Sequence, residues 1–251
     1  MGCDIHMYAE IKKKYKNPDA KPEWRLAGRI FKDAYYREDD TSTLSVFEDG
    51  DDWESNSQLT EHPYQGRNYD LFAILADVRN GRGFAGVDTG DGFNPIFDPR
   101  GLPEDVSKDY KQLVDNYGVD GHSHSWVTLD ELDSYDWNQV TKHRGYVSPL
   151  EYKVFKEKGH PNSWSGMVSG GKVEHISNEL MDRVLERKEY MKELETKGYI
   201  EKGKHYYTQV EWQKTYRDSV GDTFFKSVES VRDLLKRPDV LDVRLVFFFD
   251  N

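Results

Sequence analysis

The sequence predicts a single mixed α/β domain of the α+β type, in which strands near both ends of the chain join a central sheet packed by helices. Residues 3–11 alternate between apolar and polar side chains, as in a strand with one buried face. Residues 243–249 form a continuous run of β-branched and aromatic side chains, which is typical of a strand covered on both faces. Residues 1–251 fit one domain, with a helical sub-lobe expected at about 148–238.

The first predicted strand separates its side chains into two faces. The apolar face consists of Cys3, Ile5, Met7, Ala9 and Ile11. We expect this face to be buried, so that Asp4 and His6 lie side by side on the opposite face near the start of the strand. A buried Cys3 behaves as a small apolar residue and is a poor nucleophile.

Helix signals follow, with capping residues at the N-termini and stop signals at the C-termini. Helices are expected to begin near Asn68, Pro103, Thr128, Ser148, Ser177 and Asp222. The first ends at Asn80-Gly81, the second at Gly118, the fifth near Lys197 and the last before Pro238. The second half of the chain is therefore expected to be mainly helical and flanked by strands.

The composition of the chain argues against several classes of protein. A formal net charge of -11 opposes broad nucleic-acid binding, because neutralising phosphates requires an excess of Lys and Arg. A single cysteine forms no internal disulfide, which fits a reducing compartment and makes the cytoplasm the default location. Every apolar run is far shorter than the roughly 20 residues that span a bilayer.

An acidic stretch between Glu38 and Gln65 contains nine carboxylates and no Lys or Arg. Because Ser, Thr, Asn and Gly surround these carboxylates, the stretch fits an acidic, solvated flap. A cation-binding or nucleic-acid-mimicking surface is the alternative.

Two pairs of residues predict a metal site. Asp4 and His6 are two residues apart on one strand, and His122 and His124 repeat that spacing after a turn signal. If these four side chains met at one point in the fold, they would suit Zn, Mn or Fe. Each of these ions can activate a bound water for hydrolysis. In this interpretation Asp120 and His122 are the catalytic residues. The alternative is that the histidines are hydrogen-bonded structural residues.

A glycine-rich loop at 81–86 matches the letters of a dinucleotide-binding motif but follows a predicted helix rather than a strand. What remains is a loop whose backbone N–H groups, with Arg79, Asn80 and Arg82, are expected to bind an anion. A mobile surface loop is the alternative. The sequence lacks the nucleophile elbow, P-loop and zincin motifs.

Several segments together resemble a family of functionally uncharacterised bacteriophage and bacterial proteins. These segments are residues 1–6, 67–75, 78–80, 101–103 and 120–126. A looser resemblance is to calcineurin-like metallophosphoesterases, which begin with D-x-H on a strand and end with G-H-x-H. That resemblance implies that Asp4, His6, His122 and His124 bind metal, although the G-N-H-D motif of that family is missing.

The sequence thus leads to a hydrolase hypothesis: a divalent-metal enzyme, encoded by a phage, that acts on a phosphoester or nucleotide in the host cytoplasm. The alternative is a non-catalytic counter-defence protein that sequesters a nucleotide signal or blocks a host defence protein. A structural phage protein is the third possibility. The oligomeric state stays open.

Overall fold

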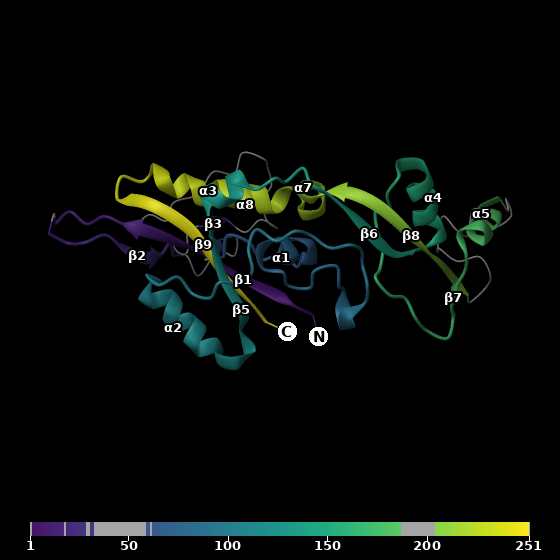
Figure 1. Cartoon of the computed structure of the whole chain (residues 1–251), viewed down its shortest axis with the longest axis horizontal. Helices are drawn as coiled ribbons and strands as arrows, with labels where there is room; N and C mark the ends of the chain where they lie inside the picture. The colour runs from purple at the N-terminus through teal and green to yellow at the C-terminus, as the bar shows by residue number, and fades with distance from the viewer. Residues whose placement is uncertain are drawn as a thin grey trace. The chain divides into compact units, whose positions relative to one another are not determined.

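The chain divides into two compact units in the computed structural model (Figure 1), which describes residues 2–17, 19–28, 31–32, 59–60, 62–186 and 204–250. The first unit comprises Met1–Val78, Asn94–Trp137 and Arg217–Asn251, and the second comprises Arg79–Phe93 and Asn138–Tyr216. Open sheets and helices occur in both units, so the predicted mixed α/β class is confirmed. The predicted acidic flap lies outside the described residues, apart from 59–60 and 62–65.

The first unit is built on an antiparallel four-stranded sheet with the order β2-β1-β9-β5. The strands are β1 (Asp4–Lys13), β2 (Glu23–Leu26), β5 (His122–Thr128) and β9 (Val240–Asp250). β1 and β9 pair along their whole lengths, from Asp4 opposite Asp250 to Lys13 opposite Val240. The predicted strands near the two ends of the chain are thus neighbours (Figure 1). A separate two-stranded sheet pairs β3 (Phe31–Lys32) with β4 (Leu59–Thr60).

Both faces of this sheet are covered. Phe248 contacts Tyr110 on α2 (Lys108–Tyr117), whereas the neighbouring Phe249 contacts Phe72 on α1 (Tyr69–Ala76). Because successive side chains of a strand point to opposite faces, the two helices cover opposite sides of the sheet. The face of β1 that carries Asp4 and His6 therefore continues into a second apolar core, in which Tyr8 is 4% exposed.

The predicted N-terminal caps of three helices are confirmed, but α1 ends earlier than the predicted Asn80-Gly81 because Asp77 adopts the left-handed conformation, with a φ of 55°, and caps it. The side chain of Asn68 accepts hydrogen bonds from the backbone N–H groups at the start of α1. The side chain of Ser148 accepts one from the backbone N–H of Glu151 in α4 (Pro149–Lys158). Thr128 and Glu131 form the capping box of α3 (Leu129–Ser134). α2 begins later than predicted, at a cap formed by Ser107.

The remaining elements of the C-terminal segment are short helices: α7 (Tyr216–Val220), α8 (Asp222–Arg232) and the 3-10 turn η6 (Asp233–Lys236). α8 and η6 together span the helix that we predicted from about Asp222 to Lys236, and its end forms a 3-10 turn. Across the described ranges, no helix has the length and apolar character needed to cross a bilayer.

The second unit contains more strand than the sequence predicts. Its sheet has the order β6-β8-β7, with β6 (Val140–Val147) antiparallel and β7 (Val173–His175) parallel to β8 (His205–Thr215). α4 and α5 (Asn178–Glu186) pack on it around a core of Val147, Tyr152, Met181, Val184, Tyr206, Val210 and Trp212. The predicted continuation of α5 to Lys197 lies outside the described residues.

A buried ion pair connects β1 to β9. Arg244 is 3% exposed and Glu10 is fully buried, and Nε and Nη2 of Arg244 each lie 2.7 Å from Oε2 of Glu10. Asp105 accepts from Arg244 at 2.7 Å and from the indole N–H of Trp24 at 2.8 Å. Oε1 of Glu10 accepts from the backbone N–H of Ser107 at 2.8 Å, so the pair also fixes the start of α2. Every charge in this network has a partner, as burial requires.

We predict that Glu10→Ala lowers the free energy of unfolding by roughly 3 to 5 kcal/mol, because it leaves Arg244 buried with only one carboxylate. Urea unfolding measures this change. Arg25→Ala, which removes an exposed arginine paired with Glu23, is the control and is expected to change the free energy of unfolding much less than Glu10→Ala does. Equal losses in the two variants would contradict the prediction.

His143 is a buried histidine of the second unit, at 4% exposure. Its ring stacks on Trp212 with centroids 5.5 Å apart, and Phe93 and Trp164 contact it at 5.9 and 6.4 Å. Burial, assisted by the charge of Lys214, lowers the pKa of His143 from 6.5 to about 4.

This shift predicts that the protein loses stability in acid. Between about pH 6.5 and about pH 4, the unfolded chain binds a proton at His143 that the folded chain does not bind. The contribution of neutral His143 to the free energy of unfolding is therefore fully present above this pH window. It falls by about 3 kcal/mol as the pH drops through the window. Urea unfolding across the window should show a smaller loss for His143→Phe than for the wild type. Parallel pH profiles would contradict the prediction.

Candidate functional site

The candidate site lies where β1 begins and β9 ends. Asp4 is directly opposite Asp250, and His6 is directly opposite Phe248. Two carboxylates facing each other across antiparallel strands repel, so each needs a counter-charge. Arg67 provides one, with Nε and Nη2 at 2.7 and 2.5 Å from the two oxygens of Asp4. The hydrogen bond from Arg67 lowers the pKa of Asp4.

The first residues of the chain are tied to the segment that contains Arg67. The backbone N–H of Cys3 donates to the hydroxyl of Tyr69 at 3.2 Å, and Cys3 is fully buried, as predicted. A Cβ on Gly2 would lie 2.7 Å from Nη1 of Arg67, so the guanidinium lies close to the backbone of Gly2. Two sequence segments that we singled out, 1–6 and 67–75, are therefore brought together.

His6 makes three contacts on the α2 side of the sheet. Its Nδ1 lies 3.2 Å from the hydroxyl of Tyr117, and its ring stacks on Phe248 with centroids 4.8 Å apart. Its Nε2 lies 3.1 Å from Oδ2 of Asp250, close enough for an ion pair but without hydrogen-bond alignment. The imidazole of His6 therefore lies between the phenol of Tyr117 and the carboxylate of Asp250.

The two other predicted imidazoles do not project the same way. Ser123 has a φ of 50°, and the β5–β9 register shifts between His122 and Ser125. This bulge places one extra residue in β5 and reverses the alternation of side chains. His124 therefore lies against Phe248, with centroids 5.3 Å apart, whereas His122 lies against Phe249 on the other face.

Three side chains around Phe248 carry unsatisfied polar atoms. Among the described residues, the buried side-chain nitrogens and oxygens that lack a hydrogen bond are Nε2 of His6, Nδ1 of His124 and the hydroxyl of Tyr110. All three rings contact Phe248, with centroid distances between 4.8 and 6.5 Å. Since buried polar groups are nearly always paired, such a concentration marks a functional candidate. We call Phe248, His6, Tyr110, Tyr117 and His124 the Phe248 cluster.

Burial shifts the protonation of this cluster. It lowers the pKa of His124, although the adjacent backbone of Gly121 partly opposes this shift, so the imidazole is neutral at pH 7. It raises the pKa of Tyr117, as does the nearby charge of Asp250. The pKa of Tyr110 is raised well above 10.0. The cluster thus contains a neutral imidazole and two protonated phenols.

The four predicted metal ligands are only partly brought together. His6 and His124 contact the same ring, Asp4 is held by Arg67, and Nδ1 of His122 lies 3.0 Å from the hydroxyl of Ser123. Across the described ranges, no three His, Cys, Asp or Glu side chains form a group able to hold a metal ion. The metal therefore stays a prediction. The predicted catalytic residue Asp120 ends the 3-10 turn η4 (Gly118–Asp120) and is exposed.

The predicted anion-binding loop belongs to the second unit, and its polar groups stabilise the loop itself. The amide of Asn80 donates to Phe93 O at 2.8 Å and accepts from Phe93 N at 2.6 Å. Arg79 donates to Gly83 O at 3.4 Å, and Arg82 lies 3.9 Å from Asp88. Whether these groups also bind an anion stays a prediction.

Gly90, which follows this loop, has a packing reason to be glycine. Gly90 has a φ of 139° and bridges to β6 at His143, where a Cβ would lie 2.1 Å from Lys142 O. The loop contains the 3-10 turn η3 (Phe84–Gly86), and Asp88 binds Arg144 on β6 at 2.9 Å. Close packing against β6, rather than contact with a phosphate, accounts for glycine at position 90.

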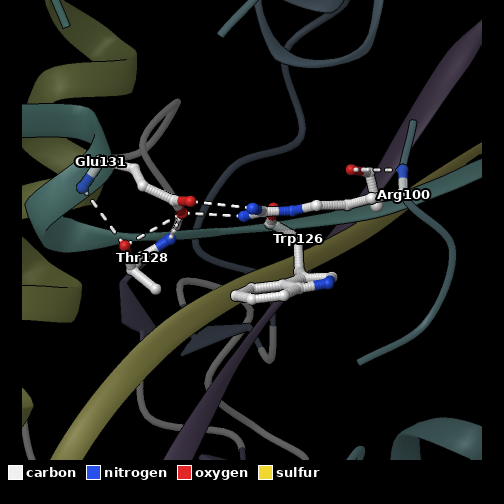
Figure 2. A network of polar contacts seen from close by, with 5 residues as sticks. Arg100, Trp126, Thr128 and Glu131 are labelled. Carbon is white, nitrogen blue, oxygen red and sulfur yellow. Dashed lines mark hydrogen bonds and ion pairs between the residues drawn. The ribbon is translucent and has the colours of Figure 1, made fainter. Parts of the chain in front are cut away.

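Arg100 is a residue that the sequence patterns do not identify. Its guanidinium lies between the rings of Phe97 and Trp126, at 3.6 and 3.7 Å from their centroids. Figure 2 shows it extended over Trp126 toward Glu131, whose two oxygens accept from it at 2.8 Å. Nε and Nη2 also donate to Trp126 O. Since Glu131 in turn caps α3 through Thr128, this network attaches α3 to β5 and is structural.

Comparison of the chain with protein-family models, curated proteins and solved structures finds no match. The two resemblances described above therefore stay expectations, and the evidence for function comes from the site itself.

We predict that Tyr110→Phe raises the free energy of unfolding by about 1 kcal/mol, because it removes a buried hydroxyl that has no hydrogen bond. Tyr117→Phe is the matched control, since its hydroxyl contacts His6 and its loss should be destabilising. Thermal or urea unfolding of both variants tests this. A Tyr110→Phe protein less stable than the wild type would contradict it.

Proposed function

We propose that this chain hydrolyses a phosphoester or nucleotide bond at the Phe248 cluster. The observation that carries the proposal is the concentration around one ring of three buried polar atoms without hydrogen bonds. Proton-transfer groups poised for a substrate are typically buried, with perturbed pKa values and unused hydrogen-bonding capacity. The phage origin, the cytoplasmic location and the substrate class are carried from the sequence as parts of the same proposal.

His6 and His124 are the proton-transfer residues in this proposal, in place of Asp120 and His122. Asp250 orients His6 from the Nε2 side, while Tyr117 contacts Nδ1. His124 is neutral because it is buried, so it is available as a base. A base that takes a proton from water and an acid that gives one to the leaving oxygen are what phosphoester hydrolysis requires.

A divalent transition metal, Zn, Mn or Fe, belongs to an alternative form of the proposal, in which His6 and His124 act as metal ligands and not as proton-transfer residues. Nε2 of His6 and Nδ1 of His124 are ring nitrogens without hydrogen bonds, which is the state that binds such ions. A carboxylate ligand would come from Asp250. The ion would supply a bound water of lowered pKa.

The test is incubation of the purified protein with nucleotides and model phosphoesters, followed by separation of products. We expect turnover in the wild type, and a decrease of roughly 100-fold or more in kcat for His6→Ala and for His124→Ala. His160→Ala is the matched control, because His160 lies in the second unit and contacts Pro161 O. Turnover that is equal in all variants would reject the proposal.

The same experiment separates the alternative function. If heat releases an intact nucleotide that the wild type has bound, the protein sequesters its ligand without turnover. Elemental analysis of the wild type and of both variants tests the metal: bound Zn, Mn or Fe in the wild type should decrease in each variant. Blocking of a host defence protein through the acidic stretch concerns residues outside those described.

A further inference from the structure

Arg67 stands out because Asp4 uses only part of its hydrogen-bonding capacity. Nε and Nη2 donate to the two carboxylate oxygens, which leaves Nη1 directed away from this pair. The side chain is 54% exposed. A guanidinium has five N–H donors in a planar fork, so an oxyanion can bind along the edge that Asp4 does not occupy.

The guanidinium of Arg67 is oriented by its two hydrogen bonds to Asp4. Its guanidinium lies over Gly2, where a Cβ would be 2.7 Å from Nη1, and the nearby Tyr69 binds the backbone of Cys3. Asp4, its partner, is two residues from His6 on the same face of β1 and interacts with the charge of His6. An anion at Arg67 would therefore lie beside the Phe248 cluster. Fixed donors bind at a smaller entropic cost than mobile ones.

Two other arginines of the first unit, Arg244 and Arg100, are engaged differently. Arg244 is buried and bound to Glu10 and Asp105. Arg100 is held between two rings and bound to Glu131 and a backbone carbonyl. Arg67 combines a fixed orientation with an exposed edge, which is the arrangement that suits an external oxyanion.

We propose that Arg67, oriented by Asp4, binds the phosphoryl group of the substrate through the N–H groups that Asp4 does not use. The inference rests on the proposed function and deepens it, since it assigns the phosphate-binding role that the sequence gives to Arg79 and Arg82. The ligand class is a phosphate ester or a nucleotide phosphate.

The charges nearby also indicate the form in which the phosphate binds. Asp4 neutralises Arg67, and Asp250 lies directly opposite Asp4 at 31% side-chain exposure. A bare phosphate dianion would be repelled by Asp250, whereas a phosphate that arrives with a divalent cation would not. We therefore expect binding to be stronger for the cation complex than for the free anion.

The test uses isothermal titration of the full chain with inorganic phosphate and with pyrophosphate, each with and without Mg²⁺. We expect the wild type to bind pyrophosphate more tightly with Mg²⁺, and Arg67→Met to weaken binding by at least about tenfold. The affinity of Arg67→Lys for pyrophosphate should lie between those of the wild type and Arg67→Met, because a lysine retains the charge but not the planar fork. Arg25→Met is the matched control, an exposed arginine paired with Glu23 on the same sheet, and should bind as the wild type does.

Circular dichroism checks that each variant folds, and Arg67→Lys keeps the test valid if Arg67→Met does not. Affinity of Arg67→Met or Arg67→Lys equal to that of the wild type, or no phosphate binding by the wild type, would overturn the inference. Failure of the proposed hydrolysis can be distinguished from failure of phosphate binding at Arg67. His6→Ala and His124→Ala should lose turnover yet bind pyrophosphate within about threefold of the wild type if Arg67 holds the phosphate.

Discussion

The pairing of β1 with β9 is the constraint on which the rest of the first unit depends. It joins segments at the two ends of the chain, and the buried pair between Glu10 and Arg244 fixes it from within. A buried charge is tolerated only when its partner is correctly placed, so alternative registers of the two strands are strongly disfavoured. The same register places Asp4 opposite Asp250 and His6 opposite Phe248. The structural pair at one end of the strands thus determines the geometry of the candidate site at the other.

β9 also explains why the imidazoles gather around one aromatic ring. It lies between β1 and β5, so Phe248 has His6 on one side and His124 on the other. The bulge at Ser123 turns His124 toward Phe248 and His122 toward the opposite face. Without the extra residue, the alternation of a regular strand would place both imidazoles on one face. A local backbone irregularity therefore decides which histidine joins the site.

Charge balance gives the site its chemical character. Two facing carboxylates are each provided with a partner, Arg67 for Asp4 and His6 for Asp250. Both pairs are partly exposed, so solvent screens them and a ligand can compete for them. In the neighbouring Phe248 cluster, Nε2 of His6, Nδ1 of His124 and the hydroxyl of Tyr110 lack hydrogen bonds. An arrangement of this kind favours a ligand that carries both an anionic group and a counter-cation.

The sequence by itself determined the fold class, the strands near both ends, the helix caps at Asn68, Thr128 and Ser148, and the pairing of Asp4 with His6 on one face. These features follow from local periodicity and capping, which short segments specify. The strands β6 and β8 were missed, because their polar alternate residues make them inconspicuous. Only the tertiary structure revealed Arg67, Asp250, Tyr117 and Phe248 as neighbours of His6. Strand order, register and the β5 bulge depend on contacts between residues far apart in the chain, and no local pattern encodes them.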